Sequence, residues 1–143
     1  MSHRFTVEVE WQKGLEGKAA PRGVSAEVAF AVPAEFGGPG GEWTPEHFFA
    51  AGINTCIMAT FLGIAQGSKL PLASYSSEAT ATLEKTPAGL RMTEVEIRPR
   101  ITVKNEADRD RALRLIEKAE TLCPISHSVT AKVTLSPTVE VGS

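Results

Sequence analysis

Residues 44–66, TPEHFFAAGINTCIMATFLGIAQ, decide the fold of this chain. Thr44 is a favourable N-cap, Pro45 suits the first helical position, and the acidic Glu46 is favoured at the positive end of the helix dipole. No residue in 48–68 carries a charge. A helix that is apolar on nearly every side is either buried in protein or placed in a membrane. We predict a buried central helix; a membrane span, for which about 20 residues suffice, is the alternative.

The predicted helix places a carboxylate and a thiol on one face. At about 100° per residue, Glu46, Cys56 and Thr60 fall within an arc of roughly 80°. Glu46 and Cys56 are nevertheless about 15 Å apart along the axis, at about 1.5 Å per residue. They can cooperate only if a second copy of the helix lies antiparallel beside the first, with Glu46 of one copy near Cys56 of the other. A two-fold axis would then create two equal sites.

Length and charge limit the class of protein. The 143 residues suffice for one domain, which we place at 1–143, and the net charge is −2. No basic stripe is present, so no nucleic-acid partner is expected. The N-terminal segment MSHRFTVEVE is charged and alternating rather than apolar, and this predicts a cytoplasmic protein. In the cytoplasm the two cysteines, Cys56 and Cys123, should be reduced thiols.

The rest of the chain predicts an α+β fold with mostly antiparallel sheet. Alternating apolar residues predict strands at 5–11 and 22–32, which should form a hairpin, and 33–41 is a loop rich in Gly and Pro. Further strands are expected at 75–85, 90–104 and 131–135, with a second helix at 106–122 and a short helical turn at 124–128. Asn105 should cap the second helix, whose apolar stripe would be Leu113, Ile116 and Leu122. Pro99 predicts a sheet edge or a bulge.

The cysteines are the main candidates for chemistry. Cys56 lies inside the apolar helix, and Cys123 lies at the predicted start of the short turn, where a helix dipole would favour the thiolate. The alternative is that both are small buried side chains without a reaction to perform. A metal site with Cys123 and His127 as ligands, and His47 and Cys56 as further ligands, is another possibility, but the spacing matches no zinc pattern. We therefore predict no metal and no cofactor.

Two motifs resemble those of the OsmC family, which includes osmotically inducible protein C and the organic hydroperoxide resistance proteins. WTPEHFFAAGINTCIMATFL at 43–62 is similar to the first motif of that family, and LCPIS at 122–126 is similar to the second. The segments KGLEGKA at 13–19 and PAEFGGPGG at 33–41 resemble the hydroperoxide resistance branch. The resemblance covers nearly the whole chain.

The resemblance implies a fold and a reaction. Family members are intertwined homodimers in which sheets wrap two central helices. Active members reduce organic hydroperoxides or hydrogen peroxide: the first cysteine becomes a sulfenic acid and the second condenses with it to a disulfide. On this basis Cys56 would be the peroxidatic cysteine and Cys123 the resolving cysteine. A dithiol, such as a lipoyl protein, would restore the thiols.

The chain lacks the activating arginine at both of the positions that are usual in the family; in the second of these it has Ala34-Glu35-Phe36. In the hydroperoxide resistance branch an arginine in the first hairpin turn pairs with the glutamate that here is Glu46, and it stabilises the thiolate. This chain has Leu15 at that place. Arg22 is our candidate for a replacement cation, and Lys18 and His47 are alternatives. Without a cation, the protein would be a weakly active or non-catalytic family member that binds a small hydrophobic ligand between the helices.

Overall fold

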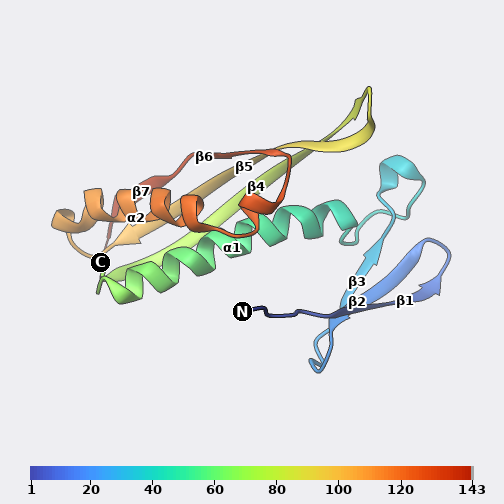
Figure 1. Ribbon diagram of the computed structural model, residues 1–143, viewed down its shortest axis with the longest axis horizontal. Coiled ribbons are helices and arrows are strands. Elements are labelled where there is room, and N and C mark those ends of the chain that lie inside the picture. The colour runs from blue at the N-terminus through green and yellow to red at the C-terminus, as the bar shows by residue number, and fades with distance from the viewer. Residues whose placement is uncertain (143) are drawn as a thin grey trace. The chain divides into compact units, whose positions relative to one another are not determined.

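A computed structural model describes residues 1–142. The chain divides into two compact units, Met1–Phe48 and Phe49–Ser143, which are described separately here. Figure 1 shows the strands of the first unit in blue and the sheet and helices of the second in green to red. The fold is a mixed α+β fold, as predicted, while the prediction of one domain over 1–143 stays a prediction.

The first unit contains a three-stranded antiparallel sheet in the order β1-β2-β3. Its strands are β1 (Val7–Lys13), β2 (Glu16–Pro21) and β3 (Val28–Ala31), and a 3-10 helix η1 (Ala34–Phe36) follows. The predicted hairpin between 5–11 and 22–32 is wrong, because β2 lies between β1 and β3. β2 has no apolar alternation, and its Gly17 is buried. A Cβ at Gly17 would lie 2.8 Å from the Glu10 carbonyl oxygen, so only glycine fits between the neighbouring strands.

The second unit is built on a long antiparallel hairpin. Its strands are β4 (Leu72–Thr86), β5 (Gly89–Val103), β6 (Lys132–Leu135) and β7 (Thr138–Val141). β6 and β7 both pair with β5, and both run parallel to it. The sheet is therefore mixed. The parallel pairing follows from the crossover through the second helix, since a parallel neighbour needs a long connection.

Pro99 lies in the middle strand of this sheet rather than at an edge. β5 pairs with β4 on one side, and on the other side it pairs with β6 over 94–97 and with β7 over 100–103. Pro99 falls between these two partners, while its pairing with Ser77 of β4 continues without a shift of register. The prediction of an edge or a bulge was wrong. Between the ends of β6 and β7 no strand needs a hydrogen bond from β5, so a proline, which lacks an N–H group, fits there.

Both helices of the second unit contribute to one core with the sheet. α1 (Pro45–Gly67) confirms the predicted helix, and α2 (Arg109–Leu122) follows the 3-10 helix η2 (Glu106–Asp108). Alternate residues of β5 pack against one row of apolar residues from each helix. The buried members are Val95, Ile97, Ile101 and Val103 of β5, Ile53, Ile57, Phe61 and Ala65 of α1, and Ala112, Ile116 and Ala119 of α2.

The predicted stripe of α2 is only partly correct. Ile116 is buried, but Leu113 is 38% exposed and Leu122 is 54% exposed. Small residues, Ala112 and Ala119, occupy the core face instead, because they allow the helix to approach the sheet closely. Asn105 precedes η2, but its side chain makes no capping hydrogen bond to the backbone and instead donates to the Asp108 carboxylate at 3.3 Å.

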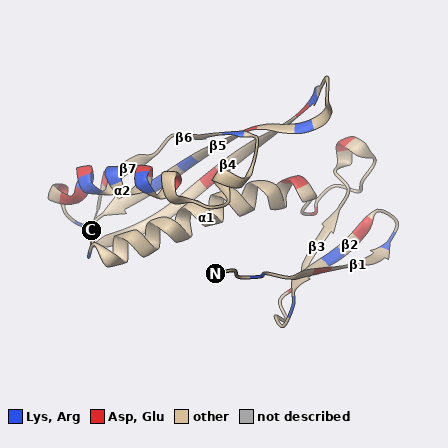
Figure 2. Ribbon diagram, in the orientation of Figure 1, with Lys and Arg blue, Asp and Glu red and all other residues tan. Residues whose placement is uncertain are grey.

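α1 has one covered face and one apolar face that the rest of its unit leaves open. Met58 and Leu62 are 38% and 37% exposed. Figure 2 shows that α1 carries no charged residue after its first turn, whereas α2 carries many. On length and composition alone α1 could cross a membrane, but the core helix of a soluble protein passes the same test.

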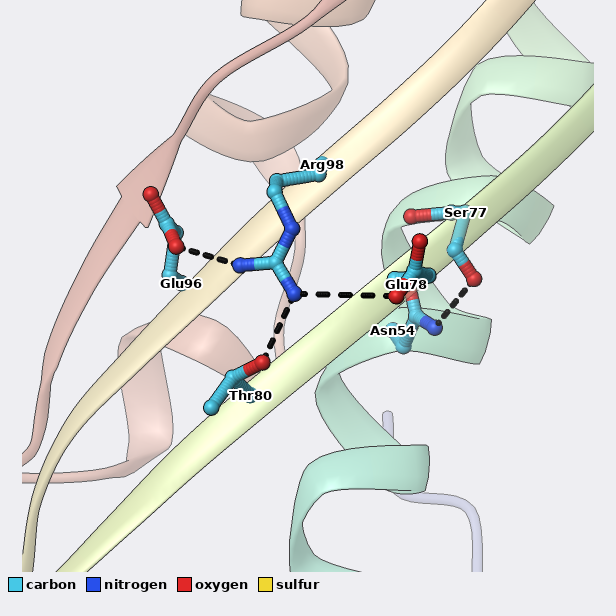
Figure 3. A network of polar contacts seen from close by, with 6 residues as sticks. All are labelled: Asn54, Ser77, Glu78, Thr80, Glu96 and Arg98. Carbon is cyan, nitrogen blue, oxygen red and sulfur yellow. Dashed lines mark hydrogen bonds and ion pairs between the residues drawn. The ribbon is translucent and has the colours of Figure 1, made fainter.

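The opposite face of the sheet is polar. Arg98 of β5 forms ion pairs with Glu96 and Glu78, and it donates a hydrogen bond to Thr80 Oγ1 at 2.7 Å (Figure 3). On the helix side of β4, Asn54 of α1 donates to the Ser77 carbonyl oxygen at 3.2 Å (Figure 3). These contacts tie β4 to β5 and to the middle of α1, the segment that carries Cys56.

Candidate active site

The site begins at the first turn of α1, where a reciprocal cap fixes the start of the helix. The Thr44 hydroxyl accepts a hydrogen bond from the His47 backbone N–H at 3.3 Å, and the Thr44 backbone N–H donates to His47 Nδ1 at 2.9 Å. This is a capping box in which histidine replaces the usual Glu or Gln. Because a backbone N–H can only donate, Nδ1 accepts in this hydrogen bond. The His47 side chain is therefore engaged in the helix cap.

Glu46 lies in the same turn, at the positive end of the helix. Its Oε1 atom is buried and has no hydrogen-bond partner within residues 1–142. A buried carboxylate oxygen without a partner is costly, so Glu46 is not explained as a purely structural residue. Glu46 and Cys56 lie ten residues apart on α1, as the sequence predicted.

Cys56 lies in the middle of α1 and is half-buried. Its Sγ atom lies 4.0 Å from Thr60 Oγ1, one turn further along the helix. Burial raises the pKa of the Cys56 thiol, and a hydrogen bond and the charge of Cys123 raise it further; the Ile125 backbone and Thr60 act in the opposite direction. Desolvation therefore dominates, and the thiol tends to keep its proton.

Cys123 lies at the C-terminal end of α2, with its own backbone in the extended region. It is fully buried, and the Ser126 backbone N–H donates to its Sγ atom at 3.4 Å. The prediction that Cys123 lies at a helix start is wrong, because Cys123 follows the last turn of α2 and the next helix, the three-residue η3 (Ser126–Ser128), begins three residues later. A single backbone amide, rather than a helix dipole, is directed at the sulfur.

The turn between Cys123 and η3 brings the two cysteines together. Ser126 is buried, and its hydroxyl donates to the Cys123 carbonyl oxygen at 3.2 Å and to the Glu120 carbonyl oxygen at 3.4 Å. Ile125 packs on α1 beside Gly52, where an added Cβ would lie 3.8 Å from Ile125 Cγ2. Cys56 packs against the buried cluster that contains Cys123. Two segments far apart in the sequence thus bring both cysteines to the same buried cluster.

The candidate cations have other partners in this structure. Arg22 lies 3.8 Å from the Glu8 carboxylate, and Lys18 lies 3.8 Å from that of Glu27; all four side chains are largely exposed. Within the described part of the second unit, the groups that act on the pKa of Cys56 are Cys123, the Ile125 backbone and Thr60, and none of them is a cation. The role predicted for Arg22 stays a prediction. Over residues 1–142 no three His, Cys, Asp or Glu side chains are grouped to hold a metal ion.

Comparison with known proteins identifies the family. Residues 38–138 match the family described as "OsmC-like protein", and the chain therefore belongs to it. An uncharacterised protein of Acinetobacter baylyi is 28% identical over 126 residues, which cover 87% of this chain and 85% of that protein.

Solved structures support the same fold. An OsmC-like protein of unknown function from Vibrio cholerae superposes with a TM-score of 0.86 at 19% identity, covering 95% of this chain and 99% of that one. An organic hydroperoxide resistance protein OsmC from Legionella pneumophila superposes with a TM-score of 0.71 at 24% identity, covering 96% and 97%. At these identities the likeness shows the fold alone. Some of the structural neighbours are named hydroperoxide resistance proteins.

Three residues have roles that the sequence analysis does not predict. Helical periodicity places Thr60 on the face of Cys56, but it does not predict the contact of its hydroxyl with the sulfur. The LCPIS motif contains Ser126 without indicating its hydrogen bonds to the end of α2. For His47, the spacing T-x-x-H from Thr44 is the signal of a reciprocal cap of the S/T-x-x-E/Q type.

Proposed function

We propose that this protein is a cysteine-dependent peroxidase that reduces organic hydroperoxides or hydrogen peroxide. The observation that carries the proposal is that Cys56, a half-buried thiol, packs against the buried cluster that contains the fully buried Cys123. An accessible thiol is suited to attack a peroxide, and a neighbouring protected thiol is suited to condense with the sulfenic acid that results. Some of the structural neighbours are named organic hydroperoxide resistance proteins, and these names are in line with the proposed reaction.

The assignment of roles follows from exposure. Cys56 would attack the terminal peroxide oxygen as a thiolate and become a sulfenic acid. Cys123 would then displace hydroxide and form the Cys56–Cys123 disulfide. A dithiol, of which a lipoyl protein is one example, would reduce the disulfide in the cytoplasm. Glu46 would orient a cation, for which Arg22 of a second copy is our candidate.

A homodimer is part of the proposal. In the second unit the open face of α1 includes Met58 and Leu62, and in the first unit the apolar face of β1 exposes 70% of Val9 and 74% of Trp11. Neither apolar surface is covered within its own unit. A second copy of the chain would cover such surfaces and would supply a donor for the unpaired Glu46 oxygen.

A second candidate function is binding without catalysis. It is favoured by the raised pKa of Cys56, on which no cation of the described second unit acts. The protein would then hold a small hydrophobic ligand beside α1, and both thiols would stay reduced when peroxide is added.

The decisive variant is Cys56→Ser. We expect the wild-type protein to consume an alkyl hydroperoxide with dihydrolipoamide as reductant, and Cys56→Ser to consume none above the background. Thr55→Ser, on the adjacent exposed position of α1, is a matched control that should keep the wild-type rate. If Cys56→Ser consumes peroxide as fast as the wild type, the proposed function is wrong.

A further inference from the structure

The apolar helix that carries Cys56 offers its sulfur few polar neighbours. On a helix, the side chains nearest to Cys56 are those three and four residues away, which are Gly52, Ile53, Ala59 and Thr60. Among these four, only Thr60 has a polar side chain. Its Oγ1 atom lies 4.0 Å from the Cys56 sulfur, the length of a long hydrogen bond to sulfur, and both side chains are half-buried. The contact is therefore partly shielded from water.

The two other threonines within α1 and α2 use their hydroxyl groups differently. The Thr55 hydroxyl donates to the Ala51 carbonyl oxygen at 2.7 Å, and the Thr121 hydroxyl donates to the Glu117 carbonyl oxygen at 3.1 Å. Such a bond to the preceding turn is the common arrangement for threonine inside a helix. Thr60 makes no such bond within residues 1–142, and its hydroxyl lies against the sulfur instead. The Thr60 hydroxyl is therefore available to Cys56.

A hydroxyl suits both protonation states of the thiol. It can donate and accept, so beside the protonated thiol either atom can be the donor. A thiolate can only accept, and the Thr60 hydroxyl then turns its hydrogen to the sulfur without movement of the heavier atoms. A hydrogen bond to the charged form favours that form. Burial has the largest effect on the pKa of Cys56 and raises it, whereas the Thr60 hydroxyl acts to lower it.

We propose that Thr60 is a positioning residue for Cys56, whose hydroxyl donates to the thiolate and holds the sulfur in one place on α1. The inference deepens the proposed peroxidase function, because the thiolate is the form that attacks peroxide. It gives to α1 itself a part of the stabilisation that a cation would otherwise provide.

The first test follows the titration of Cys56 without peroxide. Reduced protein reacts with iodoacetamide between pH 6 and pH 11, and peptide mass spectrometry measures alkylation of Cys56 separately from that of Cys123. Thr60→Val removes the hydroxyl and keeps the branched shape, whereas Thr60→Ser keeps the hydroxyl. Thr55→Val removes a hydroxyl that bonds to the backbone of the same helix and is the matched control. The other titratable side chains of the cluster, Cys123 and Tyr75, are the same in every variant.

We expect the pH midpoint of Cys56 alkylation to rise by about one unit in Thr60→Val, the order of effect of one hydrogen bond to a charged group. The rate at pH 7 should fall by about threefold rather than tenfold, because a thiolate of higher pKa is also a better nucleophile. For the same reason the rate of Thr60→Val at alkaline pH should exceed that of the wild type. Thr60→Ser and Thr55→Val should follow the wild type.

The second test connects the contact to the reaction with peroxide. Consumption of one equivalent of cumene hydroperoxide in the first turnover, measured by rapid quench, should be about threefold slower at pH 7 in Thr60→Val than in the wild type. The difference should close at alkaline pH, where both proteins hold Cys56 as a thiolate. A wild type that consumes no peroxide would refute the proposed function, and the alkylation profiles would still decide whether Thr60 acts on Cys56.

Two results would overturn the inference. One is an alkylation profile of Thr60→Val that overlays the wild type. The other is an equal shift in Thr60→Ser or Thr55→Val, which would show that packing or the helix, rather than the Thr60 hydroxyl, sets the titration. Thermal unfolding checks that each variant folds. Thr60→Ala removes the same hydroxyl with a smaller side chain and takes the place of Thr60→Val if that variant does not fold.

Discussion

At the residue scale, the chemistry of the site depends on which groups surround each sulfur. Cys56 is set on an apolar helix, and its polar neighbours are few: a thiol, a hydroxyl and a backbone amide. This environment disfavours a charged sulfur, because the cost of removing the thiolate from water exceeds the stabilisation that these weak hydrogen-bond donors provide. The same holds for Tyr75 on β4, whose buried hydroxyl has no hydrogen-bond partner within residues 1–142 and whose pKa burial raises to about 12.

These two groups predict how stability depends on pH. A group whose pKa is higher in the folded than in the unfolded protein stabilises the fold while it is protonated, and that stability is lost as pH rises. We expect the free energy of unfolding of the reduced protein to fall from about pH 8.5, the value of a free thiol, and further above about pH 10, the value of a free tyrosine. Urea unfolding between pH 7 and pH 11 measures this.

Two variants show which residue causes each part of the fall in the free energy of unfolding. Cys56→Ala should flatten the first part of the decline, and Tyr75→Phe should flatten the second, because each removes one titrating group. A decline of equal slope in the wild type and Cys56→Ala would contradict the raised pKa of Cys56.

At the scale of the elements, α1 could be predicted from its sequence because a cap, a proline at the first position and an uncharged run all agree. β2 could not be predicted in this way, because its sequence shows no apolar alternation and its small residues serve the close approach of the neighbouring strands. The predicted core face of α2 is wrong for a similar reason, namely close packing. Small alanines, rather than the larger leucines, face the sheet. The cysteines were found from their motifs, but the turn that joins them depends on Ser126 and Ile125, whose contacts are tertiary.

The cap of α1 gives a prediction at this scale. His47→Ala removes the acceptor for the Thr44 backbone N–H and should destabilise the protein by about 1 kcal/mol, the usual value of a lost cap. His47→Gln keeps an acceptor at the same position and should retain most of the stability. Thermal unfolding of the two variants tests this. Equal losses in both would show that the ring of His47, which packs edge-on to Trp43, matters rather than the hydrogen bond.

At the scale of the whole molecule, the proposal requires two copies. We expect sedimentation to show a dimer at micromolar concentration. Leu62→Glu places a charge on the open face of α1 and should dissociate or unfold the protein. Leu113→Glu, at a side chain of nearly equal exposure on α2, is the matched control and should leave the dimer intact. A folded wild-type monomer at that concentration would contradict the homodimer.

The central claim is that the two thiols react with peroxide as a pair, and one measurement tests it most directly. Reduced protein is treated with one equivalent of an alkyl hydroperoxide, and its intact mass and free-thiol count are determined. The account predicts the loss of both thiols of each chain and a mass lower by that of two hydrogen atoms, which marks a Cys56–Cys123 disulfide. Unchanged mass with both thiols still free would contradict the account and favour a protein that binds its ligand without reacting.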